Sequence, residues 1–284
     1  MNLDELRTFL EVVDTGSLVT AAKRLNVTPS TVTARINGLE DEIGQKLLHR
    51  NKSGAELTSP GFKFKRYAEL MVQLWSQARS EVSLPRGFDG VCNVGLDFDL
   101  WQGLGQRFLD HVRQTSPGVA LAFWPGDQRM IDRWLDIGLV DIAFTYAPQG
   151  GEKFASRVLC DDELILVSKV PMAAPVLDHS YVYVDHGDGF RRQHAAAYRG
   201  DVTSALVIAS SGWALDHLLR NGGSGYLPRR NVEIHVSQGG LHIVADAPVF
   251  TRRVHVVENA QTVQGWDWYA AALAAAAAPM PVGR

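Results

Sequence analysis

The chain has 284 residues, of which 46% are hydrophobic and 21% are charged, and its formal net charge is −3 at pH 7. This composition is ordinary for globular proteins, and the length leaves room for one small and one larger domain with separate cores. No apolar run approaches the roughly 20 residues that span a bilayer, and the polar, acidic residues 1–5 do not look like a secretory leader. We therefore expect a cytoplasmic protein that does not enter a membrane.

The charge is unevenly distributed along the chain. Residues 15–66 hold nine basic and four acidic side chains, a local charge of +5, so the remaining residues sum to −8. Attraction to a phosphate backbone depends on the local charge. The negative total therefore does not exclude a DNA-binding N-terminal region.

Residues 17–44 have the pattern of two short helices joined by a tight turn. Ser17 is a good N-cap for the first helix, and Asn26 tolerates the left-handed conformation that a sharp turn requires. Thr28 caps the second helix, with Pro29 at its first position, where a missing N–H group costs nothing. Core-facing residues then recur at helical spacing, at Val32, Ile36, Leu39 and Ile43. This is the pattern of a DNA-binding helix-turn-helix.

The candidate DNA contacts lie in this motif and in a hairpin that follows it. Short hydroxyl side chains and arginine suit base edges and phosphates. The candidates of the motif are Ser17, Thr28, Pro29, Ser30, Thr31, Thr33 and Arg35. Residues 46–50 and 56–58 predict two short strands, a wing in which Arg50 and Lys52 follow the DNA backbone or enter the minor groove. The alternative is a solvated hairpin tip. We assign residues 1–58 to this winged helix-turn-helix.

A long helix is predicted from residue 59 to about residue 82. Its apolar stripe consists of Tyr67, Leu70, Met71, Leu74, Trp75, Ala78 and Val82. Such a stripe lies either on its own domain or against a second copy. Its place between a DNA-binding head and a linker at residues 85–87 favours self-association, which would present two heads to a pseudo-palindromic site. We therefore expect residues 59–87 to link and dimerise the protein.

From residue 88 onward, strands alternate with helices. This order predicts an α/β fold with mostly parallel strands, and two successive runs indicate two lobes with a cleft between them. We place lobe 1 at about residues 88–168 and 252–284, and lobe 2 at about 169–251. Residues 253–257 would return the chain to lobe 1.

Ligands of open α/β sheets bind beyond the carboxyl ends of the strands, where loops and helix N-termini meet. This rule selects Asp97, Phe98, Asp99, Leu100, Trp101, Gly126 and Tyr146 in lobe 1. In lobe 2 it selects Asp185, Phe190, Ser210, Ser211, Gly212 and Tyr226.

Several of these residues have an alternative, structural interpretation. Ser210 and Ser211 either offer hydroxyl and N–H groups to an anion or only cap the helix that follows. Asp97, Asp99 and Asp185 oppose a plain carboxylate ligand and favour a cationic or hydroxyl-rich one, unless they are solvated or paired with arginine. The aromatic candidates either form an apolar wall or belong to the core.

The remaining ionisable groups indicate neither a metal nor an enzyme. Cys92 and Cys160 lie in apolar surroundings without metal-ligand spacing, and His186 and His194 either titrate near neutrality or are structural. No His-Glu-x-x-His, Cys-x-x-Cys or Gly-x-Ser-x-Gly occurs. We therefore expect no catalytic residue, cofactor or metal site.

Taken together, these residues resemble the LysR-type transcriptional regulators over nearly the whole chain. The matching positions of the head include Gly16-Ser17, Ala21-Ala22, Leu25, Val32, Ile36, Leu39-Glu40, Gly44, Leu47-Leu48 and Leu57-Thr58. Pro29 and Ala34 depart from the family, which commonly has glutamine and arginine there. Farther on, residues 138–143 and 225–228 resemble the family's effector-binding domain. Residues 184–194 and 247–251 resemble its HdfR-like subgroup, although His186 stands where that subgroup usually has tryptophan.

The resemblance implies a winged helix-turn-helix and linker helix joined to a two-lobed, periplasmic-binding-protein-like α/β effector domain. It implies a regulator that binds double-stranded DNA and is controlled by a small-molecule effector held between the lobes. The expected assembly is a homodimer or homotetramer, with RNA polymerase as a further partner if the protein is an activator. The alternative function is a DNA-binding regulator without a metabolite ligand, whose C-terminal half serves only oligomerisation.

Overall fold

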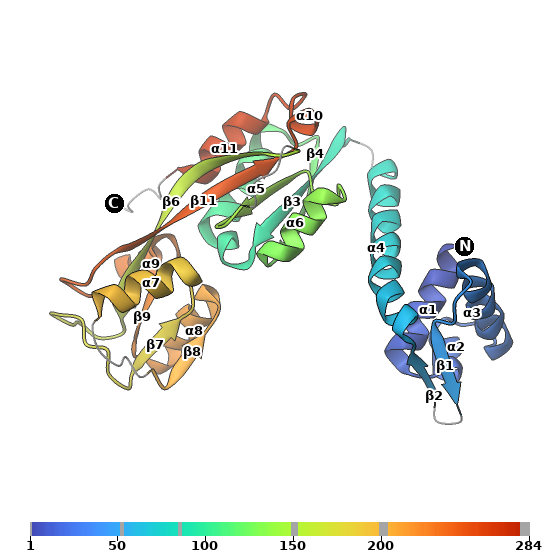
Figure 1. The fold of residues 1–284 in the computed structure, drawn as a ribbon. Coiled ribbons are helices and arrows are strands. Elements are labelled where there is room, and N and C mark those ends of the chain that lie inside the picture. Colours follow the sequence, from blue (N-terminus) through green and yellow to red (C-terminus); the bar gives the residue numbers. More distant parts are fainter. Residues whose placement is uncertain (1, 52–53, 85–86, 149–152, 199–203, 279–284) are drawn as a thin grey trace. The chain divides into compact units, whose positions relative to one another are not determined.

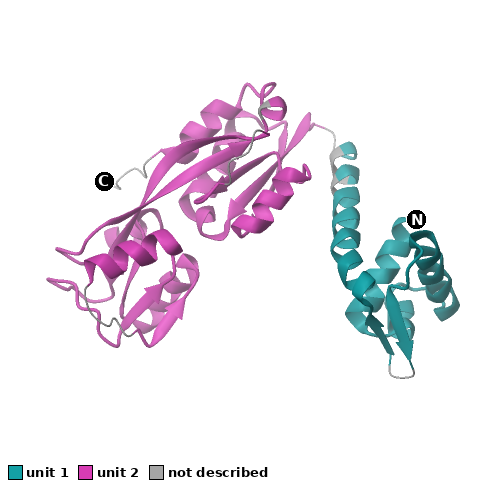
Figure 2. Ribbon diagram, viewed as in Figure 1, with its two compact units in different colours: residues 1–84 teal, residues 85–284 magenta. Residues whose placement is uncertain are grey.

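The computed structural model describes residues 2–51, 54–84, 87–148, 153–198 and 204–278. The chain forms two compact units, residues 1–84 and 85–284, which are described separately (Figure 2). Among the described residues, no helix is both long and apolar enough to cross a membrane.

The first unit is a winged helix-turn-helix followed by a long helix (Figure 1). Its elements are α1 (Leu3–Thr15), α2 (Leu18–Arg24), α3 (Pro29–Ile43), β1 (Leu48–Asn51), β2 (Gly54–Leu57) and α4 (Ser59–Val82). The predicted caps are confirmed, since the Ser17 and Thr28 side chains accept hydrogen bonds from the first turns of α2 and α3. Asn26 has the left-handed conformation that the turn was expected to need, with φ 53°.

The core of this unit joins all its helices and the wing. Phe9, Val32, Ile36 and Leu39 are fully buried, and the Phe64 ring of α4 lies 5.5 Å from the ring of Phe9. The apolar stripe of α4 is thus divided. Of the predicted stripe, Met71 packs on the head, beside Phe64, Ala68 and Val72, whereas Tyr67 is 48% exposed and Trp75 is 52% exposed.

Gly54 holds the wing against the turn between α1 and α2. The Ala55 N–H donates to the Gly16 carbonyl oxygen at 2.8 Å. A Cβ atom on Gly54 would lie 2.4 Å from the same oxygen, and φ at Gly54 is +145°. Only glycine fits both constraints, so the wing is fixed at this point.

Glu40 connects the second helix of the motif to the wing. Its side chain is buried and accepts hydrogen bonds from the backbone N–H groups of Leu47 and Leu48, at 2.9 and 3.1 Å. Lys46 lies 2.8 Å and Arg50 lies 3.4 Å from its other oxygen. Burial raises the pKa of Glu40, but the bond from Lys46 and the two backbone bonds lower it by more, so the group is a carboxylate in the folded protein.

The second unit carries one continuous sheet with the strand order β4-β3-β5-β11-β6-β9-β7-β8, and β10 pairs with β6. The strands are β3 (Gly90–Asp97), β4 (Val119–Gly126), β5 (Ile142–Thr145), β6 (Ala155–Ser168), β7 (Tyr181–Val184), β8 (Leu206–Ile208), β9 (Ser224–Pro228), β10 (His242–Ile243) and β11 (Phe250–Glu258). The helices are α5 (Gln106–Thr115), α6 (Gln128–Asp136), α7 (Asp188–Ala197), α8 (Ser211–Asn221), α9 (Arg229–Ser237), α10 (Ala260–Val263) and α11 (Tyr269–Ala277).

Two long antiparallel strands, β6 and β11, run through both lobes (Figure 1). The first half of β6 and the end of β11 pair beside β5 in lobe 1, whereas the second half of β6 pairs with β9 and β10 in lobe 2. The expected parallel pairing holds for β3 with β4 and β5, and for β7 with β8 and β9. The antiparallel pairings of β11 with β5 and β6, and of β6 with β9, were not predicted from the sequence.

Each lobe has its own core. Lobe 1 buries Val94, Leu96, Phe108, Phe144, Val256 and Leu273 together. In lobe 2, Ile165 and Val167 of β6 face the core beneath α8, whereas Leu164 and Leu166 face the core that contains Phe190 of α7. This half of β6 is therefore buried on both faces, which is why it is a continuous apolar run in the sequence.

We predict that replacing Glu40 by alanine destabilises the head by about 3 kcal/mol, because two buried N–H groups and two cations lose their shared acceptor. Thermal unfolding of the full chain measures this change. Alanine at the adjacent, exposed Asp41 serves as the control and should leave the unfolding temperature unchanged. Equal stability of the two variants would contradict the role given to Glu40.

The Glu40 bonds also set a pH dependence. The folded-state pKa lies below the unfolded value of about 4.3. The stabilisation is therefore fully present above that pH and is lost as the pH falls through the folded-state pKa. The wild-type head should lose stability in this acidic window more steeply than the Glu40→Ala variant.

Candidate functional site

The N-terminus of α3 presents a row of hydroxyl groups. Thr28 and Ser30 are exposed, and their side-chain oxygens lie 2.8 Å apart. The Thr28 oxygen also accepts from the Thr31 N–H at 3.2 Å, and Thr33 donates to the Pro29 carbonyl oxygen at 3.0 Å. Ser17 caps α2 in the same way, by accepting from Thr20. These contacts fix Thr28, Ser30 and Thr33 in the first turns of α3, and Ser17 at the start of α2.

The two arginines predicted to contact DNA are also bound within the head. Arg35 donates to Asp4 Oδ2 at 3.1 Å and to Thr8 Oγ1 at 3.2 Å, both on α1. Arg50 donates to Asn37 Oδ1 at 2.9 Å, in addition to its pairing with Glu40. Each is thus oriented by an internal partner. The remaining prediction, Lys52, lies outside the described residues.

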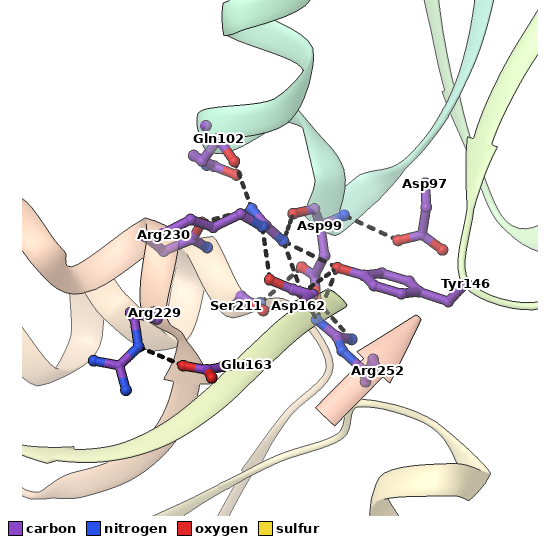
Figure 3. Close-up of polar contacts among 12 residues, drawn as sticks. Asp97, Asp99, Gln102, Tyr146, Asp162, Glu163, Ser211, Arg229, Arg230 and Arg252 are labelled. Atoms are coloured by element: carbon purple, nitrogen blue, oxygen red, sulfur yellow. Dashed lines mark hydrogen bonds and ion pairs between the residues drawn. The ribbon is translucent and has the colours of Figure 1, made fainter. Parts of the chain in front are cut away.

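In the second unit, polar residues from both lobes meet around Asp162 of β6 (Figure 3). Arg230 Nε donates to Asp162 Oδ1 at 2.9 Å, and Arg252 Nη2 donates to Oδ2 at 2.9 Å. The Tyr146 hydroxyl donates to the same Oδ2 at 2.8 Å, and the Arg252 guanidinium lies 3.8 Å from the centre of the Tyr146 ring. We refer to Asp99, Tyr146, Asp162, Ser211, Arg230 and Arg252 as the interlobe cluster.

The charges of the interlobe cluster stabilise one another in a buried place. Burial raises the pKa of Asp162, but Arg230 and Arg252 lower it by more, so the carboxyl stays ionised. For Arg230 the directions are reversed. Burial lowers its pKa, but the nearby Tyr146 and Asp162 raise it by more, to above its usual range. Such a group of ions is stable only while every partner is present.

Asp99 connects the two lobes within this cluster. It lies in a short turn after β3 of lobe 1, and it is 8% exposed. Its Oδ1 accepts from the Ser211 N–H at 2.9 Å, and its Oδ2 accepts from the Ser211 hydroxyl at 2.7 Å, both at the start of α8 in lobe 2. Arg230 Nη2 donates to the Asp99 backbone oxygen at 2.7 Å.

Two further ionisable groups border the cluster. Burial lowers the pKa of His186 to about 4, so its ring is neutral near pH 7. Its Nε2 donates to the Tyr226 carbonyl oxygen at 2.8 Å, and its Nδ1 lies 3.9 Å from Asp99 Oδ2. Burial raises the pKa of Asp97 to about 6, and its Oδ1 accepts from the Asp99 N–H at 3.1 Å.

A kink before α5 brings lobe 1 close to α9. Gly103 has φ +80°, and a Cβ atom there would lie 3.4 Å from the Arg230 side chain. Arg230 Nη1 donates to the Gln102 carbonyl oxygen within this kink. The backbone is not helical at Gln102 and Gly103, so the Gln102 carbonyl oxygen is available to the arginine.

The other predicted effector residues are distributed between the surroundings of the cluster and the two cores. Ser210 caps α8, and a Cβ atom on Gly212 would lie 3.1 Å from Gln102 Nε2 of lobe 1. The side chains of Leu100, Trp101, Phe190 and Tyr226 pack in or against the cores. Phe98 is 58% exposed, Gly126 lies against the Trp134 ring, and Asp185 pairs with Arg191 at 3.3 Å.

Buried histidines near this region have structural partners. His194 is 4% exposed, its Nε2 lies 2.9 Å from the Tyr181 hydroxyl, and burial lowers its pKa. Both His186 and His194 are therefore neutral near pH 7.

Three members of the cluster, Asp162, Arg230 and Arg252, were not among the residues predicted from the sequence. Asp162 and Arg252 face each other only through the register of β6 with β11. Arg230 lies on α9, which follows Pro228 without a side-chain cap. Asp162 stands between two exposed acidic residues, Asp161 and Glu163, so no local pattern in the sequence marked it as the buried ion.

A cavity of about 500 Å³ borders the same cluster and includes Asp162 and Arg230 in its lining. Arg107 and Cys160 of lobe 1 and Glu233 of α9 also line it. The Arg107 guanidinium donates to the Ala276 carbonyl oxygen at the end of α11. Space for a small molecule therefore exists beside the charged groups that join the lobes.

We predict that Asp162→Asn lowers the stability of the second unit by about 3–5 kcal/mol, because Arg230 and Arg252 remain buried without their counter-charge. Chemical denaturation of the full chain measures the loss. The control is Asp161→Asn on the exposed side of the same strand, for which a change below about 0.5 kcal/mol is expected. Comparable losses for both variants would show that the buried pairing is not responsible.

Comparison with known proteins assigns a family to both units. Residues 3–62 match the family described as bacterial regulatory helix-turn-helix protein, lysR family, and residues 85–265 match the LysR substrate binding domain. The HTH-type transcriptional regulator HdfR of Salmonella schwarzengrund is 27% identical over 260 residues, covering 90% of this chain and 92% of that relative.

Solved structures show the same fold. The crystal structure of CbnR, a LysR family transcriptional regulator, has a TM-score of 0.73 at 16% identity and covers 98% of this chain and 100% of CbnR. Full-length LysG of Corynebacterium glutamicum has a TM-score of 0.54 at 21% identity, with 98% of each chain covered. With both family domains matched in order along its length, the chain belongs to the LysR family and is a DNA-binding transcriptional regulator with an effector-binding domain.

Proposed function

We propose that this regulator reads duplex DNA with the N-terminal part of α3 and its β1–β2 wing. The observation that carries the proposal is the exposed row of Thr28, Pro29 and Ser30 at the start of α3, in a region of local charge +5. Hydroxyl groups at a helix N-terminus suit phosphates and base edges. A structure of CbnR in complex with its target DNA, with a TM-score of 0.73 to this chain, supports the same use of the fold.

We further propose that the protein is cytoplasmic and that a small-molecule effector binds at the interlobe cluster. The cluster gathers charged and hydroxyl groups from both lobes beside a cavity, and the structure of LysG with bound effector Arg supports this use of the second domain. An effector changes the arrangement of the lobes only by its different affinity for the two arrangements. RNA polymerase is a further partner if the protein activates transcription.

The exposed second half of the α4 stripe supports a homodimer, or a tetramer built from two dimers. Trp75 is 52% exposed and Val82 is 88% exposed, beyond the part of α4 that packs on its own head. A large apolar surface on a helix favours burial against a second copy. Two heads joined in this way fit a two-fold symmetric DNA site.

The DNA proposal predicts that Arg35→Ala weakens operator binding by about 1–3 kcal/mol if the guanidinium reads a base. The operator is first located by chromatin footprinting of the tagged protein in its host, with Thr33→Ala, Arg35→Ala as the binding-deficient pair. Affinity is then measured at fixed salt. Asp4→Ala is the matched control, because it removes the partner of Arg35 but keeps the guanidinium, and it should bind at least as well as the wild type. Unchanged affinity for a folded Arg35→Ala variant would remove Arg35 from the site.

The dimer proposal predicts that Trp75→Glu shifts the full chain toward monomer at micromolar concentration, as measured by analytical ultracentrifugation. A buried charge in a helix–helix interface is strongly unfavourable. Gln73→Glu adds the same charge on the opposite side of α4 and should leave the assembly intact. A wild-type protein that sediments as a monomer, or equal effects of both variants, would refute the proposed interface.

A further inference from the structure

The contact between Asp99 and Ser211 has the chemistry of a bound carboxylate ligand. Ser211 is the first residue of α8, and the first N–H groups of a helix have no partner within the helix. A small anion at such a place binds to a free N–H group and a nearby hydroxyl. Here both donors are taken by the two oxygens of one carboxylate, at 2.9 and 2.7 Å, and that carboxylate belongs to the protein itself.

The contact is not a local cap of the helix. Ser210 already supplies the ordinary N-cap by accepting from Trp213. Asp99 comes from the other lobe, 112 residues earlier in the chain, and both it and Ser211 are buried. Arg252 Nη1 lies 3.9 Å from Asp99 Oδ2, so the carboxylate also has a cation nearby. The position is therefore a complete anion site, filled from across the interface of the lobes.

A second observation indicates what this region still lacks. The His186 side chain is fully buried, and its Nδ1 has no hydrogen-bond partner among the described residues. Because Nε2 carries the proton that is donated to the Tyr226 oxygen, Nδ1 presents a lone pair. Nδ1 lies 3.9 Å from Oδ2 of Asp99, so two acceptor atoms lie close together. A group that satisfies both must donate hydrogen bonds, as an ammonium or a hydroxyl group does.

We propose that Asp99 is a built-in anionic ligand of lobe 2 and determines the specificity of the interlobe site. Its carboxylate occupies the α8 anion site and holds the lobes in contact without an effector. The wild-type site consequently rejects simple carboxylates and takes a small molecule that presents an ammonium or hydroxyl donor to Asp99 and His186. The regulatory meaning of this inference rests on the proposed function, but its test requires neither DNA nor the natural effector.

The test is rescue of Asp99→Ala by sodium formate, with sodium chloride at equal ionic strength as the reference. Loss of two charge-assisted hydrogen bonds should lower the melting temperature of the variant by at least about 6 °C. Formate should then restore part of this loss in a saturable manner, because the vacated space again receives a carboxylate. Wild type, whose anion site is filled, should show no formate-specific stabilisation.

Ser211→Ala supplies the matched control from the other side of the contact. The double variant Asp99→Ala, Ser211→Ala lacks the hydroxyl donor and should respond more weakly to formate than Asp99→Ala alone. If Asp99→Ala does not fold, refolding in formate but not in chloride is the expected result. The proposal is overturned if wild type and Asp99→Ala respond equally to formate. It is also overturned if Asp99→Ala refolds in neither salt while Asp99→Asn, which lacks the charge, is as stable as wild type. None of these results depends on whether the protein binds an operator.

Discussion

The second unit depends on the burial of Asp162 between two arginines. An ionised carboxyl can be removed from water only where its charge and its lone pairs are matched, and Arg230, Arg252 and Tyr146 provide this match. These partners come from different elements, since Tyr146 follows β5 of lobe 1, Arg252 lies in β11 and Arg230 lies on α9 of lobe 2. Because β6 and β11 belong to both lobes, the requirement to satisfy one carboxylate fixes how the lobes meet.

The head uses a buried carboxylate for a related purpose. Glu40 binds the backbone N–H groups at the start of β1, so the wing cannot move independently of α3. Arg35 and Arg50 are held by Asp4, Asn37 and Glu40. A DNA phosphate or base would therefore share or replace contacts that already orient these side chains. Such pre-ordered groups lose less conformational entropy when they bind.

Local signals in the sequence were sufficient for much of the fold. Caps at Ser17 and Thr28, the turn at Asn26 and the apolar repeat of α3 each depend on neighbouring residues, and all were predicted correctly. The interlobe cluster depends instead on the register of distant strands. The first half of β6 is exposed and lacks an apolar pattern, and α9 lacks a side-chain cap. The full lengths of this strand and this helix could therefore not be predicted from the sequence. Asp99 and Ser211 were both predicted as effector contacts, yet their bond to each other could be seen only once the lobes were placed.

The carboxylate of Asp99 joins the two lobes by binding Ser211 at the start of α8. The most direct measurement is amide hydrogen exchange at Ser211 in wild type and in Asp99→Ala. Since Ser211 begins α8, its N–H has no partner within the helix, and its protection reports on the bond to Asp99. We expect slow exchange at this amide in wild type and fast exchange in the variant. Fast exchange in wild type, or equal protection in both proteins, would contradict this role of Asp99.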